Sequence, residues 1–232
     1  MKSTPMMTAK VFLRKPLSKI LRKTPLVKDI FSYYHFHTQV RKSLSDCKTV
    51  LDIGCGVYSY RDPDTGEKNF HSTGIDLYQE SINESQERGI HDVYKKMNAL
   101  DIDTTFGENA FDAVIALDLL EHLEKEDGHK LLEKMEYVAK KKVIIFTPNG
   151  FLPQGERYGN PHQEHLSGWT ADEMKGLGYK VIGFGGWKWL RPINFNIRFK
   201  PEWFWWIISD VSQFFVRDIP AKSFCILCIK NK

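Results

Sequence analysis

The fold is decided by residues 50–58, which read VLDIGCGVY. The apolar residues up to Ile53 predict a buried strand, and glycines follow at positions 54 and 56. Glycine allows a tight backbone turn and leaves space for a ligand to approach the chain. The stretch therefore predicts a strand that ends in a ligand-facing turn.

An acid ends the next predicted strand. Residues 73–77 read TGIDL, so that Asp76 lies about 20 residues beyond the glycines, a spacing typical of the acid that accepts the hydroxyls of a ribose. The glycine pair alone is a weak signal, because turns use glycine for conformational reasons. The pair and Asp76 together predict recognition of a nucleoside.

The residues after the glycines distinguish two kinds of nucleoside cofactor. A pyrophosphate site favours a third glycine at the sixth position of the motif, where this chain has Ser59. Residues 60–64, which read YRDPD, make a poor helix start for binding phosphates. The carboxylate of Asp52 would repel a pyrophosphate but could position a cationic amino-acid group. We therefore expect a sulfonium nucleoside rather than a dinucleotide.

From residue 48 onward, short β-branched runs alternate with amphipathic stretches, as in a mostly parallel sheet with crossover helices. The expected strands are Thr49–Ile53, Ser72–Asp76, Val93–Met97, Phe111–Leu117, Lys142–Phe146, Lys180–Phe184 and Ser223–Ile229. The expected helices are Val27–Leu44, Leu77–Arg88, Lys125–Lys140 and Thr170–Lys175. The pattern predicts a basic arm and helix over residues 1–46 and an α/β domain over 47–232. Insertions at 148–169 and 185–220 are expected to shape the acceptor pocket.

Five segments in order resemble the class I S-adenosylmethionine-dependent methyltransferases, and within them the type 11 group of small-molecule enzymes. The segments are VLDIGCG, TGIDL, MNALDI, FDAVIALDLLEHL and VIIFTPNG, and the resemblance covers about residues 48 to 184. It implies a Rossmann-like sheet of seven strands with an antiparallel last strand and helices on both faces. It also implies S-adenosyl-L-methionine as the cofactor.

The resemblance assigns roles to the residues at the strand ends. Asp52, Gly54 and Gly56 would hold the methionine end of the cofactor, and Asp76, followed by Leu77, would hold the ribose. Other expected contacts are Asn98 and Ala99 beside adenine, and Leu117, between Ala116 and Asp118, beside the methionine portion. Tyr58 departs from the family, which often has glycine there, so an aromatic ring could close over the cofactor.

Three histidines are candidate catalytic residues. Methyl transfer requires an aligned acceptor and, for a hydroxyl, removal of its proton, which a near-neutral imidazole can accept. His122 follows the fourth strand, and His162 and His165 lie in a polar segment between the fifth strand and the next helix. His122 could instead cap or pack its loop, and His162 and His165 could lie in a solvated loop capped by Ser167 or Thr170. A His-x-x-His pair could also bind a metal, but we predict none because the sequence reveals no further ligand cluster.

The acceptor is expected to be a small molecule methylated on oxygen: a metabolite, a glycan or a lipid-linked precursor. Amino-methylating relatives carry an Asn-Pro-Pro-aromatic turn, and the order around Asn149 (Pro-Asn-Gly-Phe) does not match it. Two alternatives stay open: a catalytically silent cofactor-binding subunit or membrane adaptor, and an NAD(P)-linked oxidoreductase. Ser59, in place of a third glycine, argues against the oxidoreductase.

Charge is unevenly placed along the chain. Residues 1–28 carry eight Lys or Arg and no acid, and without those eight the net charge of +4 becomes about −4. The remainder therefore offers no general attraction for nucleic acid. The basic arm and the aromatic stretch Trp203–Ile208 could rest on an anionic membrane surface. With no spanning run and no signal peptide, we expect a cytoplasmic protein, peripheral at most to the inner face of the membrane, with four reduced cysteines.

Overall fold

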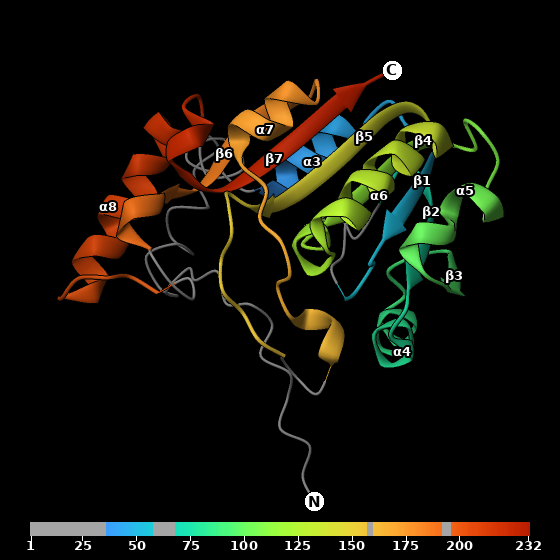
Figure 1. Cartoon of the computed structure of the whole chain (residues 1–232), viewed down its shortest axis with the longest axis horizontal. Coiled ribbons are helices and arrows are strands. Elements are labelled where there is room, and N and C mark those ends of the chain that lie inside the picture. Colours follow the sequence, from blue (N-terminus) through green and yellow to red (C-terminus); the bar gives the residue numbers. More distant parts are fainter. Residues whose placement is uncertain (1–35, 58–67, 157–159, 192–195) are drawn as a thin grey trace, which may run out of the picture.

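A seven-stranded mixed sheet forms the centre of the molecule (Figure 1). This computed structural model describes residues 36–57, 68–156, 160–191 and 196–232. The strands are β1 (Thr49–Ile53), β2 (His71–Asp76), β3 (Val93–Lys96), β4 (Phe111–Leu117), β5 (Ala139–Pro148), β6 (Lys180–Trp187) and β7 (Ser223–Asn231). Their order is β3-β2-β1-β4-β5-β7-β6, and β7 runs antiparallel to both of its neighbours. The predicted fold class is confirmed.

The burial of each strand follows from its sequence. β4, FDAVIAL, is buried over its last six residues, as expected of a central parallel strand covered on both faces. β3, VYKK, lies at the edge and exposes both lysines, which discourages pairing with another chain. β1 pairs in parallel with β2 and with β4, so the carboxyl ends of these three strands meet at one edge of the sheet.

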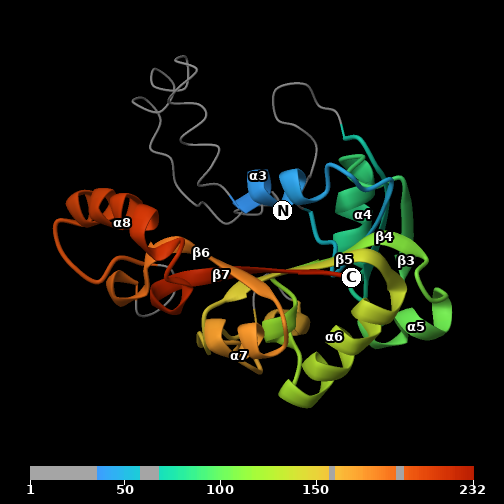
Figure 2. The same ribbon diagram turned by 90° about the horizontal axis from the view of Figure 1, so that it is seen from above.

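Helices cover both faces of the sheet (Figure 2). They are α3 (Phe36–Ser43), α4 (Gln79–Glu87), α5 (Ile102–Thr105), α6 (Lys125–Val138), α7 (Ala171–Gly176) and α8 (Glu202–Val216). One core joins α5, α6 and α7 to the sheet through residues such as Leu131 and Met135, and the other joins α3 through Val40 and Leu44. α8 packs on β6 at the far end of the sheet from β3.

The local predictions agree closely with these elements. β1 and β4 have the predicted bounds, whereas β5 and β6 each run past theirs by several residues. Only the second half of the predicted helix Val27–Leu44 is described, as α3. The basic arm, Tyr58 and the loop after it fall outside the described residues. The proposed division at residue 46 stays a prediction.

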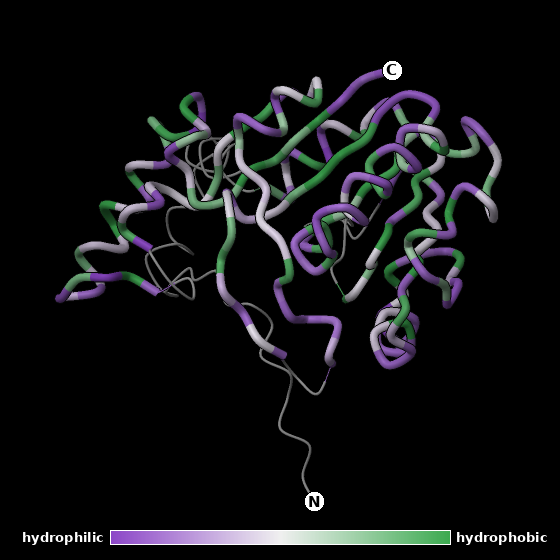
Figure 3. Tube along the Cα trace, in the orientation of Figure 1, coloured by the Kyte–Doolittle hydropathy of each residue, from purple (hydrophilic) through white to green (hydrophobic). Residues whose placement is uncertain are grey.

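Hydropathy follows the layers of the fold (Figure 3), since the central strands are the most continuously apolar segments and the helices alternate. All four cysteines are buried free thiols. None of the described helices is long and apolar enough to cross a membrane.

Candidate functional site

The turn after β1 has the conformation that its glycines predict. Gly54 and Gly56 have φ values of +66° and +43°, in the left-handed region that favours glycine. A Cβ on Gly54 would come within 2.9 Å of Leu119 Cδ1, whereas a Cβ on Gly56 would meet, among the residues that the structure describes, only a carbonyl oxygen at 3.8 Å. The turn therefore packs against the segment after β4 on one side and keeps open space at Gly56. That space fits the close approach of a cofactor.

Asp76 closes this edge from the end of β2. Its carboxylate accepts hydrogen bonds from the backbone N–H of Gly56 (3.3 Å) and of Tyr78 (2.8 Å). Burial raises the pKa of Asp76, and these two N–H groups partly offset that rise. The donors fix the carboxylate at the carboxyl end of β2, beside the glycine turn.

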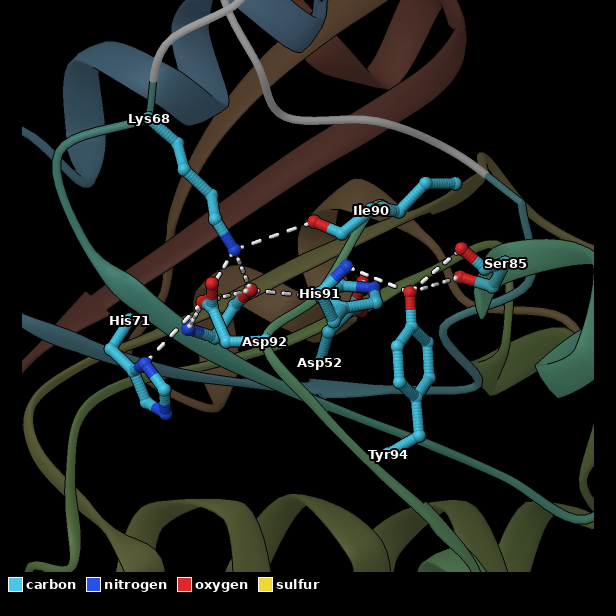
Figure 4. Close-up of polar contacts among 9 residues, drawn as sticks. Asp52, Lys68, His71, Ser85, Ile90, His91, Asp92 and Tyr94 are labelled. Carbon is cyan, nitrogen blue, oxygen red and sulfur yellow. Dashed lines mark hydrogen bonds and ion pairs between the residues drawn. The ribbon is translucent and has the colours of Figure 1, made fainter. Parts of the chain in front are cut away.

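Asp52 lies beneath the turn rather than at its open edge. Its carboxylate is buried against His91, with Oδ2 3.3 Å from Nε2, and neither side chain exposes more than 1% of its surface (Figure 4). Gly74 makes room for this pair, because a Cβ there would lie 2.6 Å from His91 Cδ2. The contact places Asp52 in an internal polar layer that supports the glycine turn.

That layer continues to the start of β2 (Figure 4). His91 Nδ1 lies 3.2 Å from Ser72 Oγ, and Lys68 Nζ donates to the same hydroxyl (2.6 Å) and to Asp92 (2.5 Å). The hydroxyl of Tyr94 accepts from the backbone N–H of His91 at 2.8 Å. The charge-assisted bond from Lys68 to Asp92 ties the segment before β2 to the segment before β3.

The other residues expected at the cofactor vary in position. Asn98 is exposed after β3 and caps the next turn by accepting from the N–H of Leu100 (2.9 Å), with Ala99 half-buried beside it. Leu77 is exposed next to Asp76. Leu117 instead points into the core shared with α3, so only its backbone can face the edge.

Two of the three candidate histidines come together. His122 belongs to the 3-10 helix Leu120–His122 after β4, and its ring stands 4.8 Å from that of His165, edge to face. Glu121 lies beside them: each of the three side chains has one potential metal-binding atom within 4.8 Å of those of the other two. His162 is exposed on the turn Pro161–Gln163, outside this set. We call Glu121, His122 and His165 the histidine cluster.

Backbone carbonyls orient both rings of the histidine cluster. His122 Nδ1 lies 2.9 Å from the carbonyl oxygen of Glu164, and His165 Nδ1 lies 2.6 Å from that of Leu152. A carbonyl oxygen only accepts hydrogen bonds, so each Nδ1 carries the proton. In the neutral ring Nε2 then has the lone pair, as a general base or a metal ligand requires.

Two carboxyl groups at this position share an unfavourable environment. Burial raises the pKa of Glu121 well above its usual range, and the neighbouring charge of Asp118 raises it further. Its Oε2 accepts a hydrogen bond from Thr147 at 2.9 Å, which opposes the rise. Burial likewise raises the pKa of Asp118 to about 7. A cation would therefore be stabilised beside these groups.

The loop that carries His165 is fixed to the segment after β4 by Trp169. This fully buried indole donates to the carbonyl of Leu120 (3.3 Å) and to Ser167 Oγ (3.1 Å). It packs against Gly128 of α6, where a Cβ would lie 2.4 Å from the ring. In front of His165 is an open hollow of about 470 Å³, lined by Phe151, Pro153, Gln154, Gly155, Glu156 and Glu164. The hollow offers space for an acceptor.

Asn149, after β5, is committed to internal hydrogen bonds. Its amide nitrogen donates to the carbonyls of Pro220, Ala221 and Ser223, and its oxygen accepts from the N–H of Ala171. The side chain is buried and ties three segments together. It is therefore not placed to receive an acceptor amine.

Sequence reasoning missed Glu121 and His91. Glu121 stands next to His122, and the spacing Asp-x-x-Glu-His after β4 was the available signal. His91 gives no signal, because only the fold brings it to Asp52.

Comparisons with known proteins agree with this arrangement. Residues 51–147, from β1 to β5, match the family described as a methyltransferase domain. The crystal structure of a SAM-dependent methyltransferase from Archaeoglobus fulgidus superposes with a TM-score of 0.54 and 20% identity, over 84% of this chain and 94% of that one. The methyltransferase domain of a bacterial Hen1 gives 0.51 and 18%, over 85% and 97%.

A third solved structure, that of the small RNA methyltransferase HEN1, gives a TM-score of 0.56 and 16% identity over 99% of this chain and 27% of that one. At such identities, the likeness shows the fold. No curated protein matches significantly. Residues 51–147 of this chain therefore match a methyltransferase domain, and the chain has the fold of solved SAM-dependent methyltransferases.

Proposed function

We propose that this methyltransferase methylates a hydroxyl group of a small-molecule acceptor, and that the histidine cluster holds a divalent cation which assists the reaction. The observation that carries the proposal is the convergence of Glu121, His122 and His165 directly after β4, where Leu119 touches the glycine turn. Cofactor and acceptor ends of the site thus adjoin one another.

The cofactor would lie across the ends of β1 and β2. Gly56 would admit its methionine end, and Asp76 would receive the ribose hydroxyls. S-adenosylmethionine supplies an electrophilic methyl group, so the protein need only orient the acceptor and take its proton. Asp52 would act indirectly, because its carboxylate faces His91 and supports the turn from below.

The donor set suits a divalent transition metal. Two imidazole nitrogens and one carboxylate match Mn²⁺, Fe²⁺, Co²⁺ or Zn²⁺ better than Mg²⁺, which prefers oxygen ligands. Burial raises the pKa of Glu121 and of Asp118, and repulsion between their two carboxylates raises that of Glu121 further. A bound cation would relieve that repulsion and would favour loss of a proton from a hydroxyl beside it.

Two observations support a hydroxyl over an amine as the acceptor. An alcohol must lose a proton to become a good nucleophile, and the histidine cluster provides the means, whereas a free amine already has its lone pair. In addition, Asn149 spends its side-chain amide on three carbonyls and a backbone N–H.

Metal binding is tested by calorimetric titration of the chelator-treated protein with Mn²⁺ and with Zn²⁺. Glu121→Gln and His165→Ala should lose the binding, whereas His162→Ala, the matched control outside the cluster, should bind as the wild type does. Equal metal affinity in His165→Ala and the wild type would exclude this site.

The acceptor class is tested by transfer of the labelled methyl group from S-adenosylmethionine to a panel of sugars, phenols and lipid-linked glycans. Matched compounds with an amine in place of the hydroxyl serve as controls. An RNA with a free terminal ribose belongs in the panel, because one structural neighbour is named as a small RNA methyltransferase. Methylation of the amines alone, or of the RNA alone, would refute a small hydroxylated acceptor.

A further inference from the structure

The helix α8 turns polar residues toward the sheet and apolar residues outward, the reverse of an ordinary amphipathic helix. Its buried residues are Ser209, Gln213 and Val216, so two of the three are polar. Gln213 is fixed to β6 from both ends of its amide: Nε2 donates to the carbonyl of Gly183 (2.8 Å), and Oε1 accepts from the N–H of Gly186 (3.0 Å). Hydrogen bonds, rather than apolar packing, therefore hold much of the inner face.

The outer face of α8 is apolar. We define the α8 patch as Trp203, Phe204, Ile207, Val211 and Phe215, whose exposed fractions lie between 43% and 70%. At 3.6 residues per turn, these five side chains fall within about one third of the helix circumference. A contiguous apolar stripe of this kind on a soluble domain marks an interaction surface.

Glycines in β6 explain why the helix is bound in this orientation. A Cβ on Gly183 would lie 2.1 Å from the carbonyl oxygen of Val216, and a Cβ on Gly186 would lie 2.4 Å from that of Ser209. The backbone of α8 is thus seated directly on β6, and rotation of the apolar stripe inward would break the Gln213 bonds. The exposed stripe is a fixed feature of the fold.

The charges around the α8 patch favour one kind of partner. Residues 187–222 carry six Lys or Arg against three acids. Lys200, before the helix, pairs with Glu202 in its first turn, Arg217 follows the helix, and Arg198 lies near the exposed ring of Trp189 (6.0 Å). In a symmetric pair of copies, two faces of the same net positive charge would repel. An anionic surface would attract them.

We propose that the α8 patch docks on the surface of an anionic lipid bilayer. Trp, Phe and Ile on one face of a helix with cations nearby is the composition of an interfacial helix, which buries its apolar side at the headgroup boundary. Lys188, in the turn after β6, donates to the carbonyl of Asn149, at the start of the loop over residues 148–169 that we expect to shape the acceptor pocket. The docked surface and that loop thus share one end of the sheet. The proposal is independent of the reaction proposed above.

Vesicle sedimentation of the full chain tests the docking. Vesicles of phosphatidylcholine with an equal part of phosphatidylglycerol should bind the wild type, and pure phosphatidylcholine should bind it weakly. Ile207→Glu with Phe215→Glu should lower the partition coefficient about tenfold or more. Tyr137→Glu, a matched change at an exposed ring on α6, should leave it unchanged.

Calorimetric titration with S-adenosylmethionine verifies that each variant is folded, and Phe215→Ser, at the most exposed position, provides a milder variant. Vesicle binding that is equal in the wild type and the double variant would overturn the proposal, because the basic arm alone would then account for it. So would a wild-type dimer that the double variant converts to a monomer, because a second copy would then occupy the patch.

Discussion

Replacement of Gly54 by alanine tests the role of the glycine turn most directly. An L-residue in the left-handed region costs about 1–2 kcal/mol. The new methyl group would also stand 2.9 Å from Leu119 Cδ1, an overpacking that costs about 1–3 kcal/mol more. We expect Gly54→Ala to lower the free energy of unfolding by about 2–5 kcal/mol.

Gly89→Ala is the matched control. Gly89, after α4, has a φ of +60°, close to that of Gly54, but a Cβ there would meet nothing within 4 Å. It should lose only the conformational cost of about 1–2 kcal/mol. Urea unfolding measures both variants, and the difference between them isolates the contact with Leu119.

The same pair of variants reports on the cofactor. In Gly54→Ala, the new methyl group should push Leu119 and the turn apart. If the turn holds S-adenosylmethionine, the affinity of this variant for the cofactor should fall by about tenfold or more, which corresponds to about 1.4 kcal/mol. Gly89→Ala should bind as the wild type does in the same calorimetric titration. Equal unfolding losses in the two variants, or wild-type affinity in Gly54→Ala, would refute the reasoning.

Three further changes test the supports of the site. His91→Ala leaves the buried carboxylate of Asp52 without its partner and should cost about 2–5 kcal/mol in urea unfolding, whereas His71→Ala, at an exposed position, should cost little. Asn149→Ala strands the carbonyls that its amide now satisfies and should cost about 2–4 kcal/mol; a loss below that of an ordinary surface substitution would contradict the geometry. The carboxylate of Asp112 accepts a hydrogen bond from the N–H of Lys48, which lowers the pKa of Asp112. Asp112→Asn should therefore be less stable than the wild type above the ordinary aspartate pKa of about 3.9, and the difference should vanish as the pH falls through the lower pKa of the folded state. A difference in stability that persists at lower pH would contradict the assignment.

The sequence predicts those parts of the structure that depend on neighbouring residues. β1 and β4 are mostly apolar runs bounded by turn residues, so their limits follow from the pattern itself. Gly54 and Gly56 adopt the left-handed conformations that their motif requires. The antiparallel β7 could not be derived from periodicity, and it was expected only through the resemblance of the five motifs.

Contacts between distant segments could not be predicted in this way. His162 and His165 are equivalent by residue type and local sequence, yet only His165 reaches His122, because Trp169 fixes its loop to Leu120. The inverted face of α8 is equally hidden, since an aromatic helix would ordinarily bury its rings. It depends on Gly183 and Gly186, whose lack of a Cβ lets the helix backbone approach β6.

Leu119 adjoins both halves of the candidate site. Leu119 lies between the glycine turn, which its side chain touches at Gly54, and the 3-10 helix that carries Glu121 and His122. Any displacement of that helix must therefore change the space at Gly54, because packed side chains transmit strain rather than absorb it. Cofactor and metal should consequently bind with mutual dependence, and the reciprocity of linkage requires the same factor in both directions. A Leu119→Ala variant, which removes the contact without touching a proposed ligand, should reduce that coupling in paired titrations. Coupling that persists undiminished in Leu119→Ala would mean that the two halves communicate by another route.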